Sequence, residues 1–364
     1  MVTSPKMVIA VRLGYFFITV FLIVGILKIA TYEYPHDPAR SLTVLAWVDT
    51  IDSAIIESFE KKMGVKVYVT HFESNEELFV KLFLSNGGQY DIIMPSDYFV
   101  SKLIDHKLVK KIDTERLSFF DRLIPQLLDR PYDPHNEYSI PYCWTLYGIG
   151  VNKELANVAA HDLTWKDLFV CTESQRGTVA MVNAVREATA ITALMRYHDL
   201  HQLSEAEVTE VEELLKEQKK CVAAYVDADF RANYLLISQQ AAKAVVTSAN
   251  IARALQQYPH LDFAVPQEGG FLLIDTMMIS ANCSKEDLAY AFINFLYNPE
   301  IVAHHMQTLP VIMATQEAEE NMKAMHYSPA LIQEHFHPTK PLFLFQDIIP
   351  ESKLFDLWLA VKTT

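Results

Sequence analysis

The stretch LTVLAWVDTIDSAIIESFEKKMGVKVYVTHF (42–72) decides the fold. Its first six residues are apolar enough to predict a buried strand, and its last eight predict a second strand. Between them an apolar residue recurs at every fourth position from Ile51 to Met63, which predicts a helix that Gly64 ends. A strand, a helix and a second strand in this order form a parallel pair, so the sequence predicts an α/β fold.

Polar and aromatic residues follow the strands of this unit. NEELFVKLFLSNGG (75–88) predicts a second helix with a glycine end, and YDIIMPS (90–96) predicts a third strand. Trp47 and Asp49 then follow the first strand, and PSDY (95–98) ends the third. Ligands of open α/β sheets bind outside the carboxyl ends of parallel strands, so a binding site is expected here. A helix cap and a half-buried ring are the simpler alternative for PSDY.

The rest of the chain predicts a second lobe. After an irregular, proline-rich stretch (129–144), strands and helices alternate again. LDFAVPQEGGFLLIDTMMIS (261–280) predicts a two-strand return, and residues 285–307 predict one long helix. At 364 residues the chain exceeds the usual size of a single core, so we expect two lobes with a hinge and a central cleft. We expect an N-terminal segment and linker at 1–40, a first lobe of 41–145 plus 274–319, and a second lobe of 146–273 plus 320–364.

The first forty residues predict export. Lys6 and Arg12 precede the uncharged run LGYFFITVFLIVGIL (13–27), which is typical of an export signal. Cleavage after Ala30 would need a small residue two places earlier, where Lys28 stands, so we favour an uncleaved membrane anchor over a cleaved signal. Both alternatives place the bulk of the chain in the periplasm, and the anchor would tether it to the inner membrane.

The charge of the chain restricts its partners. Acidic residues outnumber basic residues by 45 to 31, giving a net charge of −14. A surface of that sign repels nucleic acid and attracts small cations. We therefore expect a positively charged small ligand and no nucleic-acid partner.

The sequence contains no motif of a catalytic, cofactor or metal site. GIGVNK (148–153) lacks the third glycine of a dinucleotide turn, and the histidines at 198–201 and 334–337 are more typical of a surface than of a metal site. We expect neither an enzyme nor a cofactor.

The cysteines form no Cys-x-x-Cys pair, and buried free thiols are expected rather than disulfides at Cys143, Cys171, Cys221 and Cys283.

Three positions suit a cation, and each has a simpler alternative. The indole of Trp47 and the carboxylate of Asp49 would suit an ammonium group, or they would pack in the core and begin a helix. Asp275 follows an apolar run as a counter-charge for an amine or as a solvated strand end. Glu187 follows Arg186, with which a surface ion pair is the simpler role.

Longer segments resemble a known family. The segments are WVDTIDSAIIESFEKKMGVKVYVTHFESNEELFVKL, YDIIMPSDYFVSKLIDHKLVKKID, PYDPHNEYSIPY, IGVNKEL, PQEGGFLLIDTMMI and INFLYNPE, and they lie in consistent order between Ser41 and Thr308. In these segments the chain resembles the periplasmic spermidine/putrescine-binding proteins, which are receptors of polyamine ABC importers. The resemblance implies a type II periplasmic-binding-protein fold whose two lobes close over an extended polyamine. Acidic side chains would hold the amines, and aromatic rings would line the methylene chain.

The resemblance also implies ligand-binding residues by position. They are Trp47, Asp49, Ser96, Tyr98, Glu187, Asp275 and Gln346. The chain departs from the family's ligand-contacting residues at Thr50, Ala184, Thr247, Leu273 and Val311. These departures leave open which polyamine binds.

The expected function is an extracytoplasmic receptor that binds a polyamine between its lobes and delivers it to an ABC permease in the inner membrane. A membrane-anchored sensor or interaction protein on the same scaffold, with altered or lost polyamine binding, is the alternative. An enzyme on this fold is a third hypothesis, for which the sequence offers no catalytic pair.

Overall fold

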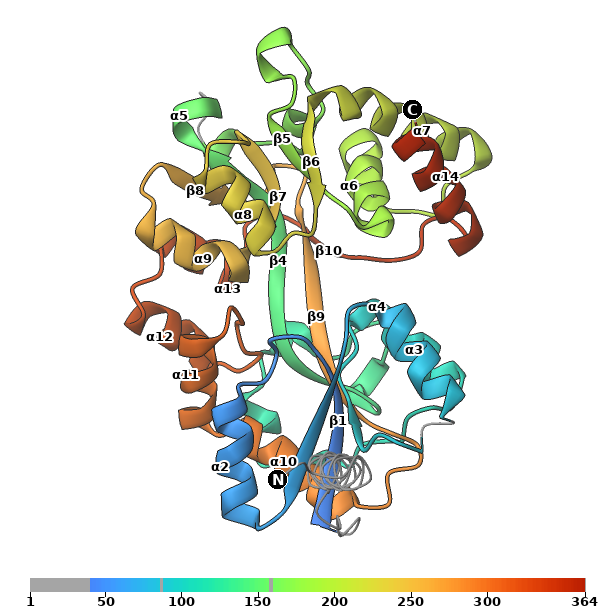
Figure 1. Cartoon of the computed structure of the whole chain (residues 1–364), viewed down its shortest axis with the longest axis vertical. Helices are drawn as coiled ribbons and strands as arrows, with labels where there is room; N and C mark the ends of the chain where they lie inside the picture. The colour runs from blue at the N-terminus through green and yellow to red at the C-terminus, as the bar shows by residue number, and fades with distance from the viewer. Residues whose placement is uncertain (1–39, 86–87, 157–159, 364) are drawn as a thin grey trace, which may run out of the picture.

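Two lobes joined by two long strands make up the described part of the chain, residues 40–85, 88–156 and 160–363, in the computed structural model (Figure 1). The joining strands are β4 (Ile140–Asn152) and β9 (Gly270–Ile279), which pair antiparallel and run from one lobe into the other. The predicted leader or anchor at 13–27 lies outside the described residues. No helix in the described ranges is both long and apolar enough to cross a membrane.

The first lobe begins with the predicted strand–helix–strand unit. β1 (Ser41–Trp47) pairs in parallel with both β2 (Lys66–Phe72) and β3 (Ile92–Ile93), as predicted. α2 (Ser53–Met63) connects β1 to β2, and the side chain of Asp52 caps its first turn by accepting from the Ala54 N–H. Gly64 ends α2 in the left-handed region, at φ 64°, which glycine adopts most easily.

Alternate residues of these strands face two helical layers. Val44 and Ile92 belong to the apolar cluster that contains residues of α2, whereas their neighbours Leu45 and Ile93 belong to the cluster that contains residues of α3 (Asn75–Leu84) and α4 (Asp97–Asp105). The sheet of the first lobe is therefore buried on both faces. α3 ends at Leu84, before the glycines that were expected to end it.

The joining strands differ from the prediction in two ways. β4 begins at Ile140, inside the stretch that was expected to be irregular. Pro141 is tolerated in this strand because it lies beside a register shift, where the ladder needs no regular N–H donor. The two strands expected at 261–280 are present, but they do not pair with each other. β8 (Leu261–Ala264) and β9 both pair antiparallel with β4, end to end along the same strand.

The second lobe continues the sheet on the other side of β4. The strands follow the order β2-β1-β3-β9-β4-β7-β5-β6, with β8 beside β4 and β10 beside β9. The strands of this lobe are β5 (Val179–Val182), β6 (Val222–Val226) and β7 (Lys243–Thr247), with β10 (Leu342–Leu344) at the joining strands. Its helices are α5 (Lys153–Ala156), α6 (Val185–Tyr197), α7 (Glu205–Gln218), α8 (Phe230–Ile237) and α9 (Ser248–Gln257).

The long helix expected at 285–307 is two helices. α10 (Glu286–Leu296) ends before Asn298, whose side chain caps α11 (Pro299–Thr308) by accepting from the Glu300 N–H. Pro299 occupies the first turn of α11, where its missing N–H costs nothing, so the break is a regular helix start. The chain then continues through α12 (Glu317–Ala324), α13 (Pro329–Phe336) and α14 (Glu351–Thr363).

Close packing at Gly148 depends on its lack of a side chain. A Cβ on Gly148 would lie 2.6 Å from the carbonyl oxygen of Ala264, so GIGVNK packs closely against β8 in a strand, away from any phosphate-loop geometry. The four cysteines are free thiols. Three are buried and Cys171 is half-buried.

Candidate ligand-binding site

A cavity of about 470 Å³ lies between the lobes, at the carboxyl ends of their parallel strands. Trp47 ends β1, Glu73 follows β2 and Tyr98 follows β3 on the side of the first lobe. Glu187 follows β5 and Asp227 follows β6 on the side of the second lobe. The same rule of sheet topology thus brings residues from five strand ends to one place.

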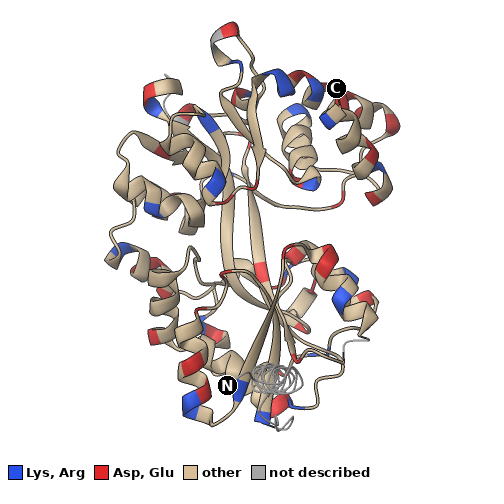
Figure 2. Ribbon diagram, viewed as in Figure 1, with Lys and Arg blue, Asp and Glu red and all other residues tan. Residues whose placement is uncertain are grey.

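The cavity is strongly acidic. Its charged lining consists of one guanidinium, Arg186, and of five carboxylates, Glu73, Glu76, Glu187, Asp227 and Glu351. Figure 2 shows acidic residues on both lobes where they face each other. Glu187 is only 8 % exposed, and this burial raises the pKa of its carboxyl group. A positive ligand group would favour the ionised form and would be attracted by its neighbours.

Aromatic rings line the same cavity. Trp47 packs against Phe72 with 4.4 Å between ring centroids, and its Nε1 is buried without a hydrogen-bond partner among the described residues. Tyr147 from β4 and Trp358 from α14 add rings on the side of the second lobe. These faces supply apolar surface and cation–π contacts for a ligand that carries both methylene groups and charge.

Arg186 bridges the two lobes across this cavity. Its guanidinium carbon lies 4.5 Å from the centroid of the Tyr98 ring, and its Nε donates to Asp347 at 2.8 Å. Its Nη1 lies 3.7 Å from a carboxylate oxygen of Glu76 on α3. The protein thus places a cation of its own on the aromatic and acidic groups of the first lobe.

Asn75 positions the tip of β3. Its amide nitrogen donates to the Tyr98 hydroxyl at 2.8 Å, and its amide oxygen accepts from the Ser96 backbone N–H at 3.1 Å. Asn75 is fully buried, so both contacts are shielded from water.

Asp275 lies on the joining strand β9, beside the tip of β3. The Ser96 hydroxyl donates to one of its carboxylate oxygens at 2.7 Å, and the Cys143 thiol donates to the other at 3.7 Å. Burial between the lobes raises the pKa of Asp275 to about 6, although its side chain keeps part of its surface open. Burial raises the pKa of Tyr147, and the negative charges of Glu187 and Asp275 raise it further. Both acids therefore lie near this tyrosine.

A family model for bacterial extracellular solute-binding proteins matches residues 54–332. The chain belongs to this family. It is 28 % identical over 288 residues to the spermidine/putrescine-binding periplasmic protein of Escherichia coli K12, covering 79 % of this chain and 81 % of that protein. It is 27 % identical over 281 residues to the putrescine-binding periplasmic protein PotF of the same organism, covering 73 % and 75 %.

Solved structures show the same fold. A putative spermidine/putrescine ABC transporter protein from Listeria monocytogenes superposes with a TM-score of 0.76 at 28 % identity, covering 89 % of this chain and 99 % of that one. The Tp0655 lipoprotein of Treponema pallidum superposes with a TM-score of 0.73 at 24 % identity, covering 89 % and 100 %, and shares the fold. The predicted two-lobed binding-protein fold and the family resemblance are confirmed.

The site residues expected for this solute-binding protein fall into three groups. Trp47, Tyr98 and Glu187 line the cavity. Ser96 and Asp275 form the hydrogen-bonded pair beside it. Asp49 and Gln346 lie outside the lining, and both are exposed. The backbone of Asp49 has a φ of 56°, and the Gln346 side chain donates to the Leu200 carbonyl at 3.3 Å.

The departures from the family pattern have structural roles of their own. Ala184 lines the cavity, where a small side chain leaves space. Thr50 donates to the Trp47 carbonyl at 3.0 Å, and Thr247 caps α9. Leu273 packs against the apolar core of the second lobe.

Several lining residues of this solute-binding protein were missed from the sequence. Glu73 follows the strand predicted at 65–72, so the strand-end rule applied to that strand would have found it. Asp227 follows β6, a strand that was not predicted from the sequence. Trp358 comes from the last helix, and nothing near it in the sequence links it to the cavity.

Proposed function

We propose that this solute-binding protein is a receptor for a polyamine of the spermidine or putrescine type. The single observation that carries the proposal is the cavity between the lobes, whose lining has five carboxylates, five aromatic side chains and one cation. Carboxylates suit the ammonium groups of such a ligand, and the rings suit its methylene chain. The names of the two Escherichia coli relatives support the same ligand class.

Binding in this proposal is hinge closure without bond chemistry. The first lobe would comprise 41–145 plus 274–319, and the second lobe 146–273 plus 320–364, so that β4 and β9 cross the boundary. A ligand that contacts both lobes favours the closed arrangement because it makes more contacts there. No cofactor and no catalytic group are needed, and the protein acts as a receptor rather than as an enzyme.

The proposed partner is an ABC permease that receives the polyamine from the closed receptor. The names of the relatives support a periplasmic location. Tethering by the N-terminal segment is a separate proposal that rests on the sequence run 13–27 alone.

Calorimetric titration tests the proposed ligand. The purified full chain is unfolded and refolded to remove carried-over ligand, and is then titrated with putrescine, spermidine, spermine, cadaverine, arginine and a neutral diol. Saturable 1:1 binding of a polyamine, with none of the diol, is the expected result. No binding across the panel would reject the polyamine proposal and would favour the alternative of a sensor or interaction protein.

A further inference from the structure

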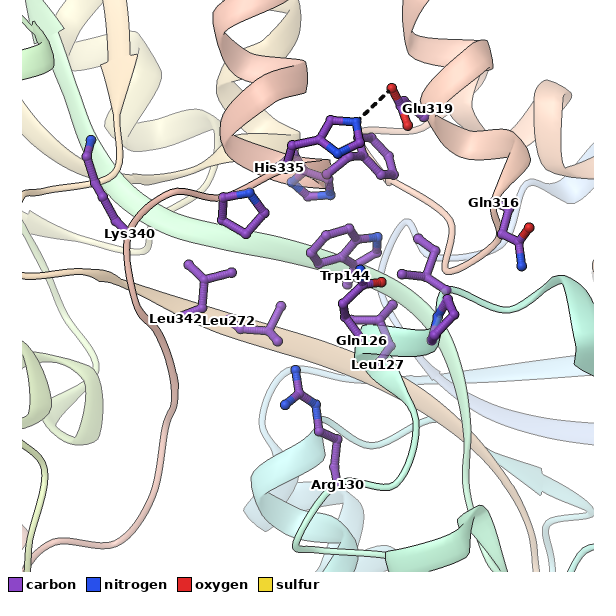
Figure 3. A pocket seen from close by; sticks show the side chains of 15 residues that line it. Gln126, Leu127, Arg130, Trp144, Leu272, Gln316, Glu319, His335, Lys340 and Leu342 are labelled. Carbon is purple, nitrogen blue, oxygen red and sulfur yellow. Dashed lines mark hydrogen bonds and ion pairs between the residues drawn. The ribbon is translucent and has the colours of Figure 1, made fainter.

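A second cavity, of about 590 Å³, lies behind the joining strands (Figure 3). Opposite residues of an antiparallel pair project to the same face, and successive residues alternate. Cys143 lies opposite Asp275, which belongs to the cleft side. The next residue, Trp144, lies opposite Ile274 and projects to the other face, where it lines this second cavity. The two cavities therefore share the strands and lie on opposite faces of them.

The walls of this hinge-back cavity are apolar and come from distant segments. Trp144 of β4 and Leu272 of β9 form its floor, with Leu127, Phe336 and Leu342 around them. The Trp144 ring lies 5.7 Å from Phe336 in an edge-on arrangement. The volume is in the range of about 300–1,000 Å³ that is usual for small-molecule sites.

Most charged groups around the hinge-back cavity already have partners. Lys340 lies 3.0 Å from Glu334 and also donates to the Val265 carbonyl at 2.6 Å. Glu319 contacts His337 at 3.2 Å and Lys323 at 2.8 Å. These pairs cancel each other, so they add little net charge to the cavity.

Arg130 is the exception. Among the described residues its guanidinium forms neither an ion pair nor a hydrogen bond, and its Nε is buried. Figure 3 shows it at one end of the cavity, with Leu272 and Trp144 toward the middle. Its charge acts on the buried carboxyl group of Asp97, but burial raises the pKa of Asp97 well above its usual range, which disfavours the ionised partner. A half-buried guanidinium without a counter-charge is costly and favours an anion.

Two further polar groups at the hinge-back cavity lack partners. Trp144 Nε1 and His335 Nε2 are buried without a hydrogen bond among the described residues. The His335 ring lies 3.8 Å from the Trp144 ring, and burial lowers the pKa of His335 to about 3, so His335 is neutral. The net positive charge of the site is therefore that of Arg130, and Trp144 adds an N–H without an acceptor.

We propose that the hinge-back cavity binds a small carboxylate with an apolar body, its carboxylate at Arg130 and its body against Trp144 and Leu272. The ligand is opposite in charge to the one proposed for the cleft. The proposal does not depend on the function of the cleft, because it rests on different residues.

Three probes that share one apolar body test this proposal by calorimetry on the full chain. They are 4-phenylbutyrate, 4-phenylbutanol and 4-phenylbutylamine. We expect 1:1 binding of the carboxylate, at least about tenfold tighter than of the alcohol, because only the carboxylate pairs with Arg130. The amine carries the charge of the ligand proposed for the cleft, so it is titrated in the presence of excess spermidine. Equal affinities for the carboxylate and the alcohol, or tighter binding of the amine under that condition, would overturn the proposal.

Variants locate the site. Arg130→Gln is expected to bring the carboxylate to the affinity of the alcohol, whereas Lys111→Gln, a matched loss of charge outside the cavity lining, is expected to leave the preference intact. Gln126→Glu places a negative charge on the exposed rim of the same cavity and is expected to weaken carboxylate binding even if Arg130→Gln does not fold. Glu187→Gln in the cleft, which is expected to affect polyamine binding, should leave the preference for the carboxylate over the alcohol intact. A preference that persists in both Arg130→Gln and Gln126→Glu, or disappears in Glu187→Gln, contradicts the assignment.

Discussion

At the scale of the residue, the two acids Asp275 and Glu187 differ in what surrounds them. Asp275 lies on a joining strand with both carboxylate oxygens in hydrogen bonds, whereas Glu187 is in the first turn of α6 at the edge of the second lobe. Both acids were predicted as ligand contacts from the sequence, first from their position in the chain and then from the family resemblance. The sequence could not show that Ser96 and Cys143 hold Asp275, because these contacts join segments far apart in the chain.

Asp275→Asn is expected to weaken polyamine binding more than Glu187→Gln, because Asp275 lies on the strand that both lobes share. Titration of the two variants with the same polyamine measures the difference. A matched control is Asp262→Asn on β8, which is outside the cavity lining. Unchanged affinity in both acidic variants would mean that the ligand does not use this cleft.

Polyamine binding should weaken as the pH falls through about 6. The raised pKa of Asp275, about 6, means that its carboxylate becomes protonated in this range in the free protein. A bound ammonium group favours the ionised form, so the pKa of the complex is lower and the affinity is fully present only above about pH 6. For one such group, the association constant is expected to fall about tenfold between pH 7.5 and 5.

Calorimetry at several pH values measures this profile, and the heats in two buffers of different ionisation enthalpy measure the protons released on binding. Asp275→Asn should flatten the profile because it removes the titrating group. A profile that keeps the same slope in that variant would assign the titration to another residue.

At the scale of the element, the sequence predicted strands and helices well where one period dominates. β1, α2 and β2 follow their apolar patterns. The prediction failed at Pro141, which was placed in an irregular stretch although it lies in β4, and at Pro299, which divides an apparently continuous helix. Whether a proline is tolerated in a strand or begins a helix depends on which backbone N–H groups need hydrogen-bond partners. The pattern of apolar side chains says little about those partners.

The end of α2 offers a test at this scale. Gly64→Ala is expected to lower the free energy of unfolding by about 1 kcal/mol, because alanine is strained at the positive φ that glycine adopts here. Gly64→Asn should cost less, since asparagine tolerates this conformation better. Urea unfolding of the two variants and the natural sequence measures both values. Equal stability of all three would show that the helix end rearranges.

At the scale of the whole molecule, the two lobes should approach each other when polyamine binds. The radius of gyration from small-angle X-ray scattering is expected to decrease on addition of saturating polyamine, because the ligand contacts both sides of the cleft. Asp275→Asn at the same ligand concentration serves as the control and should remain open. An unchanged radius at a concentration that calorimetry shows to be saturating would exclude hinge closure.

The position of β9 in the sheet also bears on how the chain folds. β9 lies between β3 and β4, and it pairs with Ile92 and Ile93 through Ile279 and Met278, with nearly the entire second lobe between them in sequence. During synthesis, the first strands of this sheet are therefore made long before β9, the strand that pairs with β3. Such distant pairing closes a long loop and slows folding. We therefore expect that the sheet of the first lobe cannot be completed before synthesis has reached β9, near the end of the chain.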